Sequence, residues 1–235
     1  MFEHINTAMT GSKSPQITTP PSSGNRLIKI VWRMLEFGWV YRLFRAFAAD
    51  DSFTNHLIED WYRVEPSTRV LDLGCGTGDT LQLLPTFASY EGHDINPDYI
   101  RLCRERFGER GNFIQTDLSC DQFGAAGQFD LALLVGVLHH LDDEACLHLL
   151  RNARRALRPG GRLVTLDGVF HSGQRPLSRF VVSLDRGRHV RREENYLALV
   201  GQIFPKIRHE VCEGRIRIPY SHILIEAVCD DAPAI

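Results

Sequence analysis

One short segment limits what this chain can fold into more than any other: an apolar run that passes directly into a glycine-rich turn. Residues 70–78 read VLDLGCGTG, and a stretch with helical character follows. Glycines allow a tight turn and a close approach of the backbone to a ligand. The segment therefore predicts a buried strand, a binding loop and the first turn of a helix.

Two well-known phosphate-binding loops do not match this segment. The P-loop requires Gly-Lys-Ser/Thr, which is missing here. The dinucleotide fingerprint requires Gly or Ala three residues after Gly76, where this chain has Asp79. A carboxylate facing a pyrophosphate is electrostatically unfavourable, whereas Asp72 at the end of the strand suits a ligand that carries positive charge.

The residues after this loop alternate between apolar runs and helical stretches. Five short apolar runs predict buried strands at Arg69 to Leu73, Ser89 to His93, Asn112 to Thr116, Phe129 to Val135 and Arg162 to Leu166. Helices are expected between them at Asp79 to Phe87, Pro97 to Phe107 and Asp143 to Leu157. Strands that alternate with helices indicate parallel crossovers and a sheet covered on both faces.

The pattern after Gly168 is weaker. It predicts two helices, at Pro176 to Leu184 and Glu193 to Ile203, followed by two strands, at Lys206 to Glu213 and Ile218 to Val228. These last strands are expected to pair as an antiparallel hairpin at the edge of the sheet. The residues from 229 to 235 are expected to be frayed.

The N-terminal region has a different composition. Residues 1–25 are rich in Ser, Thr and Pro and contain no apolar core of a secretion signal, which predicts a disordered tail and a cytoplasmic protein. Residues 26–65 have apolar residues at helical spacing and predict a helical lid. Arginines and aromatic residues alternate between 26 and 49, so an interfacial helix in contact with a membrane surface is the other interpretation.

Charge and cysteine spacing exclude several classes of protein. The net charge of −2 argues against a general nucleic-acid binder. The six cysteines are far apart in the sequence and show no CxxC spacing or Cys/His cluster, so free thiols and no metal are expected.

Five motifs in a fixed order resemble the class I S-adenosylmethionine-dependent methyltransferase family, of the type that acts on small molecules. The first is the D-x-G-x-G-x-G pattern of residues 72–78, and the second is GHDI at 92–95. The others are QTDL at 115–118, the strand from Phe129 that leads into VGVLHHL at 135–141, and LRPGGRL at 157–163. The resemblance implies an α/β fold with a Rossmann-like, doubly wound, mostly parallel seven-stranded sheet, an antiparallel edge hairpin and an N-terminal helical addition. The methyltransferase domain is expected to span residues 66–228.

The resemblance also implies S-adenosyl-L-methionine as the cofactor and indicates which residues bind it. Asp94 closes the second strand, where a carboxylate can accept both ribose hydroxyls, and Asp117 and Leu118 would hold the adenine. The full set of expected cofactor residues is Asp72, Gly74, Cys75, Gly76, Gly78, Asp94, Ile95, Asp117, Leu118, Val135 and Gly136.

Catalytic candidates follow the fourth and fifth strands, where open α/β sheets bind ligands. His139 and His140 come first, and His140 is expected to be the more important because a strand-to-helix transition sends one of two neighbours into the pocket. Asp167 and His171 follow the fifth strand. A histidine is the usual base for a hydroxyl or an ammonium acceptor near neutral pH.

The acceptor is expected to be a small molecule, methylated on O, N or C, of a natural-product or saccharide type. Arginines crowd residues 175–192, which favours an anionic acceptor bound by Arg188 and Arg191, with Tyr220 near the pocket. Two alternatives remain open: a cofactor-binding partner protein without turnover, and a methyltransferase that acts on RNA or protein. The sequence does not indicate an oligomeric state.

Overall fold

The computed structural model describes residues 51–119, 123–185, 187–216 and 218–230. The expected tail over residues 1–25 and most of the expected lid over 26–65 lie outside the described residues. Within the described part of the chain, no helix has both the length and the hydrophobicity needed to cross a bilayer.

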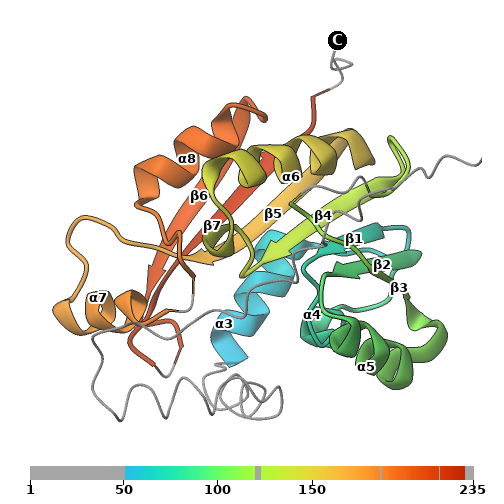
Figure 1. The fold of residues 1–235 in the computed structure, drawn as a ribbon, viewed down its shortest axis with the longest axis horizontal. Helices are drawn as coiled ribbons and strands as arrows, with labels where there is room; N and C mark the ends of the chain where they lie inside the picture. Colours follow the sequence, from blue (N-terminus) through green and yellow to red (C-terminus); the bar gives the residue numbers. More distant parts are fainter. Residues whose placement is uncertain (1–50, 120–122, 186, 217, 231–235) are drawn as a thin grey trace, which may run out of the picture. The chain divides into compact units, whose positions relative to one another are not determined.

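A seven-stranded sheet forms the centre of residues 51–230, with strand order β3-β2-β1-β4-β5-β7-β6 (Figure 1). The strands are β1 (Arg69–Leu73), β2 (Ser89–Asp94), β3 (Asn112–Gln115), β4 (Phe129–Val135), β5 (Leu157–Gly168), β6 (Lys206–Glu213) and β7 (Ser221–Val228). Strands β1 to β5 pair in parallel, and β7 pairs antiparallel with both β5 and β6. The chain reverses direction across the sheet between β1 and β4. This is the position where open α/β sheets bind ligands.

The helices lie on both faces of the sheet (Figure 1). They are α3 (Asp51–His56), the π-helical turn η1 (Leu57–Tyr62), α4 (Asp79–Leu83), α5 (Pro97–Phe107), η2 (Gly108–Arg110), η3 (Leu138–His140), α6 (Asp143–Ala156), α7 (Pro176–Ser183) and α8 (Glu193–Gly201). Alternate residues of strands such as β1, β4 and β7 divide between two hydrophobic clusters. In β1, Leu71 packs with residues of α6 and α8, whereas Val70 packs with residues of α3, α4 and α5. The all-round apolar character of the strands follows from this double covering.

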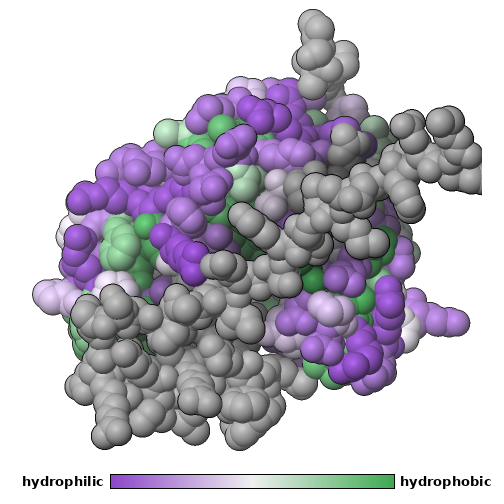
Figure 2. Space-filling model, in the orientation of Figure 1, coloured by the Kyte–Doolittle hydropathy of each residue, from purple (hydrophilic) through white to green (hydrophobic). Residues whose placement is uncertain are grey.

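Helix α6 shows how the sequence encodes one such layer. The Asp142 side chain caps it by accepting a hydrogen bond from the Ala145 N–H at 2.9 Å. Its inward stripe includes Leu149, Leu150 and Ala153, all of which are buried. The outward surfaces of α6 and α8 are mainly hydrophilic in the space-filling view (Figure 2), as expected for amphipathic helices on a globular domain.

The expected fold class is confirmed, and several boundaries differ for local reasons. Helix α4 ends at Leu83 rather than at 87, because Leu84 precedes Pro85 and takes an extended conformation. Strand β7 begins at Ser221 rather than at 218, after Pro219, which cannot donate a backbone hydrogen bond. Strand β5 is longer than expected and begins at Leu157.

The C-terminal boundary also differs from the expectation. Cys229, expected to be frayed, is buried, and its N–H and carbonyl bond to Gly161 and Gly160 at 2.8 Å each. The lysine at the start of β6 pairs with Asp230 at 2.8 Å. Residues 231–235 lie outside the described residues.

Candidate functional site

The glycine loop after β1 takes a backbone conformation that glycine favours. Gly74, Gly76 and Gly78 all have positive φ, at +83°, +54° and +78°. A side chain on Gly74 would lie 2.5 Å from Val137 Cγ2, and one on Gly78 would lie 2.3 Å from Phe107. At Gly76, in contrast, no atom of the described residues lies within 4 Å of the position that a Cβ would take. The close neighbours of the first and third glycines therefore leave no room for a side chain, whereas the second glycine faces open space.

Asp94 holds this loop at the end of β2. Its Oδ2 accepts the Gly76 N–H at 2.9 Å, and its Oδ1 accepts the Asn96 N–H at 2.8 Å. Burial raises the pKa of the Asp94 carboxyl above its ordinary value, and these two backbone hydrogen bonds oppose that shift. The carboxylate oxygens each retain a further lone pair for a hydroxyl donor.

Asp72 lies deeper, beneath the same loop. It is fully buried and accepts a hydrogen bond from Tyr90 Oη at 2.5 Å. Burial, followed by the charge of Asp72, raises the pKa of Tyr90 well above its ordinary range, so the phenol remains a donor. Sequence reasoning missed Tyr90. Tyr90 lies on the face of β2 that packs against Ile100 and Cys103 of α5, and the alternation of residues along the strand was the signal that could have found it.

The ends of β2 and β3 supply the next expected cofactor residues. Ile95 is 52% exposed, unusual for an isoleucine beside a buried strand. Asp117 accepts hydrogen bonds from the Ser119 N–H and Oγ at 3.0 and 2.6 Å, and Leu118 belongs to the core beside α6. Cys75 is buried, and its N–H donates to the His93 carbonyl, so neither its side chain nor its amide faces outward.

The turn after β4 joins the glycine loop to the catalytic candidates. Val135 ends β4, and Gly136 follows with φ of +73°. The Val137 side chain lies against Gly74, and His139 is only two residues further along the chain. The tertiary structure thus brings the β1 loop and the β4 turn into direct contact at the carboxyl edge of the sheet.

His139 is held between two carboxylates. Its Nδ1 lies 2.7 Å from Asp167 Oδ1 at the end of β5, and its Nε2 lies 3.4 Å from Asp185 Oδ1. His139 is 7% exposed and Asp167 is 1% exposed. The His139 N–H also donates to Asp167 Oδ1, at 3.2 Å. Asp167 therefore fixes the orientation of the imidazole.

The electrostatics of this group favour a positively charged imidazole. Burial opposes the charge, but the hydrogen bond to Asp167 and the charges of both carboxylates outweigh burial and raise the pKa of His139. At Asp185, burial is outweighed by the charge of His139 and by hydrogen bonds from Tyr220 and the Gly187 N–H, which lower the pKa of that carboxyl. Burial raises the pKa of Asp167, against the hydrogen bonds from His139. The group therefore binds a proton more tightly than an isolated histidine does and stabilises the resulting charge.

His140, expected to be the more important of the pair, lies beside His139. Its side chain is exposed, and its ring lies 4.1 Å from the His139 ring, centroid to centroid. The structure brings His139, and not His140, into contact with Asp167 at the end of β5. The charge of His140 also helps to lower the pKa of Asp185.

Asp185, Gly187 and Tyr220 complete the group around His139. Tyr220 Oη donates to Asp185 Oδ2, and a side chain on Gly187 would lie 2.1 Å from the His139 ring. Tyr220 was expected near the pocket, whereas Asp185 and Gly187 were not expected there. Asp185 is an isolated acid among arginines in the sequence, which was the signal available for it.

The three remaining candidates differ in their surroundings. His171 contacts the Ser172 carbonyl at 2.9 Å and lies 4.0 Å from Glu213, so the structure places it beside β6. Arg188 is exposed. Arg191 is 8% exposed, and its guanidinium donates to Asp143 and to the carbonyls of residues 138, 141 and 189. The guanidinium of Arg191 therefore holds the turn before α6 in place.

Comparison with known proteins agrees with this geometry. Residues 70–161 match the family model described as "Methyltransferase domain". This part of the chain is a class I S-adenosylmethionine-dependent methyltransferase domain. A TehB-like methyltransferase from Corynebacterium glutamicum superposes with a TM-score of 0.59 and 20% identity, over 84% of this chain and 99% of that structure. That similarity shows the shared fold.

Two curated relatives share part of this methyltransferase domain. Acetylserotonin O-methyltransferase of Mus musculus is 30% identical over 167 residues, 63% of this chain and 42% of the relative. N-terminal Xaa-Pro-Lys N-methyltransferase 1 of Mus musculus is 30% identical over 108 residues, 44% of this chain and 48% of the relative. The chain thus spans less than half the length of either relative.

The residues of the methyltransferase domain fit its cofactor, S-adenosylmethionine. The open space beside Gly76 admits a ligand, Asp94 offers acceptor oxygens at the strand end, and the exposed Ile95 offers an apolar surface to a base. The buried charge of Asp72 favours a cationic ligand nearby. Asp117 and Leu118 at the end of β3 remain predicted adenine contacts.

Proposed function

We propose that the chain transfers the methyl group of S-adenosylmethionine to a hydroxyl oxygen of a small molecule, with His139 as the general base. The observation that carries this proposal is the position of His139 between Asp167 and Asp185, next to the turn that contacts the glycine loop. The sulfonium of the cofactor supplies an activated methyl group. The protein has to bind the acceptor, orient it and remove its proton.

His139 Nε2 is the atom proposed to take the proton. Asp167 holds Nδ1 as the N–H, which leaves the lone pair on Nε2. The acceptor hydroxyl has to displace the Asp185 carboxylate from Nε2, because that carboxylate now lies 3.4 Å away. As the new O–CH₃ bond forms, the O–H bond breaks and its proton passes to Nε2. The two carboxylates then stabilise the imidazolium.

The acceptor is proposed to lie among His139, Asp185 and Tyr220. Arg188 is exposed beside this group, and it remains a proposed contact for an anionic part of the acceptor. The likeness to acetylserotonin O-methyltransferase supports a small hydroxylated acceptor. The likeness to an N-terminal Xaa-Pro-Lys N-methyltransferase makes a peptide amine the second candidate.

A labelled-methyl screen tests the proposal. Purified protein is incubated with S-adenosylmethionine carrying a labelled methyl group and with phenols, alcohols, sugars, amines and peptides that begin with Xaa-Pro-Lys. We expect transfer to a hydroxyl compound, with kcat reduced about 100-fold or more in His139→Gln. His140→Gln is the matched control and should retain activity. Transfer to the peptide alone, or equal kcat in both variants, would contradict the proposal.

A further inference from the structure

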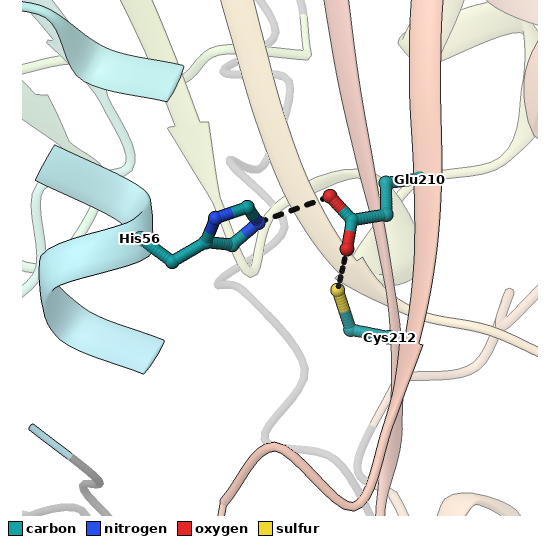
Figure 3. Close-up of side chains that lie close together, drawn as sticks. All are labelled: His56, Glu210 and Cys212. Atoms are coloured by element: carbon teal, nitrogen blue, oxygen red, sulfur yellow. Dashed lines mark hydrogen bonds and ion pairs between the residues drawn. The ribbon is translucent and has the colours of Figure 1, made fainter. Parts of the chain in front are cut away.

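Three side chains of metal-binding type meet away from the methyltransferase site, between α3 and the edge strand β6 (Figure 3). His56 Nε2 lies 3.0 Å from Glu210 Oε2, and Cys212 Sγ lies 3.2 Å from Glu210 Oε1. One ligand atom from each residue can be chosen so that all three lie within 4.8 Å of one another. The cluster therefore combines nitrogen, oxygen and sulfur donors in a small volume.

The fold creates this cluster from distant parts of the sequence. Glu210 and Cys212 are two residues apart in β6, so their side chains extend from the same face of the sheet. His56 ends α3, 154 residues before Glu210. Cys212 is buried in the same hydrophobic cluster as Phe53, Leu57 and Trp61. An apolar wall thus lies beside the donors.

Two neighbours set the direction of the His56 ring. Asp60 Oδ2 lies 2.7 Å from Nδ1, and Trp61 Nε1, which can only donate, lies 3.1 Å from Nε2. With its proton on Nδ1, the imidazole offers Nε2 as the ligand atom, directed at Glu210 Oε2 at 3.0 Å. A metal bound there takes the place of the Trp61 N–H at that nitrogen.

We propose that His56, Glu210 and Cys212 bind a zinc ion that fastens the α3–η1 segment to strand β6. Imidazole, carboxylate and thiolate are the ligand types that zinc takes in proteins, and a fourth position is left for water. Bonds of about 2.0–2.3 Å place tetrahedral ligand atoms roughly 3.4–3.6 Å apart. With one ligand atom from each residue, the three donors lie within 4.8 Å of one another, so binding requires side-chain shifts of about an ångström or less.

The residues around the cluster have the arrangement that a zinc site requires. A histidine that binds zinc through one nitrogen commonly donates its other N–H to a carboxylate, and Asp60 occupies that position here. Arg215 lies 3.9 Å from Glu210 Oε1 with a side chain that is 53% exposed, so it can move into solvent when a cation binds. Zinc binding would release the thiol proton of Cys212, which now points to Glu210.

The zinc site would support the acceptor pocket without taking part in methyl transfer. Phe53 of α3 stacks on His222 with ring centroids 5.8 Å apart, and His222 packs on Tyr220 at 4.7 Å. Tyr220 donates to Asp185 beside His139. Cys212 pairs with His222 across β6 and β7. Fastening α3 to β6 therefore fixes one wall of the group around Tyr220.

Metal binding by the full chain tests this proposal independently of activity. The protein is stripped with a chelator, and zinc affinity is measured by competition with a chromophoric chelator. Cobalt is then substituted, since a cobalt–thiolate bond gives a charge-transfer absorption. We expect one zinc per chain, and a cobalt–thiolate band that is absent in Cys212→Ser. Cys229→Ser, which replaces a buried cysteine just after β7, should retain both the bound zinc and the cobalt–thiolate band.

Two more variants keep the result interpretable if Cys212→Ser folds poorly. Asp60→Asn leaves every ligand in place and should weaken zinc binding about 10- to 100-fold. In His56→Gln, a chelator should no longer lower the unfolding temperature, whereas it does so in the unaltered protein. Folded protein that binds no zinc in the competition assay would overturn the proposal. Zinc affinity that is unchanged in both His56→Gln and Cys212→Ser would also overturn it.

Discussion

Gly76→Ala is the substitution for which the structure separates binding from stability most clearly. Gly76 has φ of +54°, a left-handed conformation that is unfavourable for any residue with a Cβ, so alanine there lowers the stability of the fold. Nothing described lies within 4 Å of the Cβ position, so the new methyl group meets no protein atom. If the cofactor fills the open space beside the loop, the methyl group collides with the cofactor instead.

The expected magnitudes follow from these two facts. A left-handed conformation costs an alanine about 1–2 kcal/mol, which lowers the unfolding temperature by roughly 2–8 °C in a domain of this size. A methyl group forced into filled space costs about 1–3 kcal/mol. That cost corresponds to a loss of about 5- to 150-fold in affinity for S-adenosylmethionine.

Gly160→Ala is the matched control. Gly160 has φ of +73° and also has no described atom within 4 Å of its Cβ position, but it lies near the start of β5, at the end of the sheet opposite the glycine loop. Calorimetric titration and thermal unfolding should show similar losses of stability in both variants and a loss of affinity in Gly76→Ala alone. Equal affinity in the two variants would refute the placement of the cofactor beside Gly76.

Three other predictions concern single residues. Asp94→Asn should weaken S-adenosylmethionine binding by about 1.5–3 kcal/mol in calorimetry, because a charged acceptor is lost; unchanged affinity in folded protein would contradict this role. The rate should fall as the pH is lowered through a pKa above the ordinary value of about 6.5, because the neutral His139 is the proposed base and its pKa is raised. Asp185→Asn should move that limb of the pH profile to lower pH, and an unmoved limb would exclude His139 as the titrating group. Arg191→Ala should lower the free energy of unfolding by about 1.5–3 kcal/mol in denaturant titrations, whereas the exposed Arg188→Ala should change it by less than about 0.5 kcal/mol.

The fold could be predicted because its signals are local. Strands β1, β4 and β6 begin and end where the apolar runs indicated. Proline explains two boundary errors: Pro85 ends α4 early and Pro219 delays β7. The acids at the ends of β1 and β2 were also predictable, because parallel strands bring their carboxyl ends to one edge of the sheet.

The orientation of the site residues could not be predicted in the same way. His139 and His140 are adjacent and chemically identical, and only the direction of the η3 turn decides which one meets Asp167. Arg191 belongs to a run of arginines that suggested an anionic ligand. Its environment, with Asp143 and three backbone carbonyls, shows that it holds the turn before α6 instead.

The amino-acid sequence by itself determined the order of the strands and helices, the glycine loop and the acids at the strand ends, because each depends on neighbours within a few residues. The tertiary structure alone decided that Asp185 meets His139, and that His56 meets Glu210 and Cys212. Each of these contacts joins elements far apart in the chain. Their side chains come within bonding distance only when the two elements pack on the same part of the sheet, and no periodicity in the sequence encodes that packing.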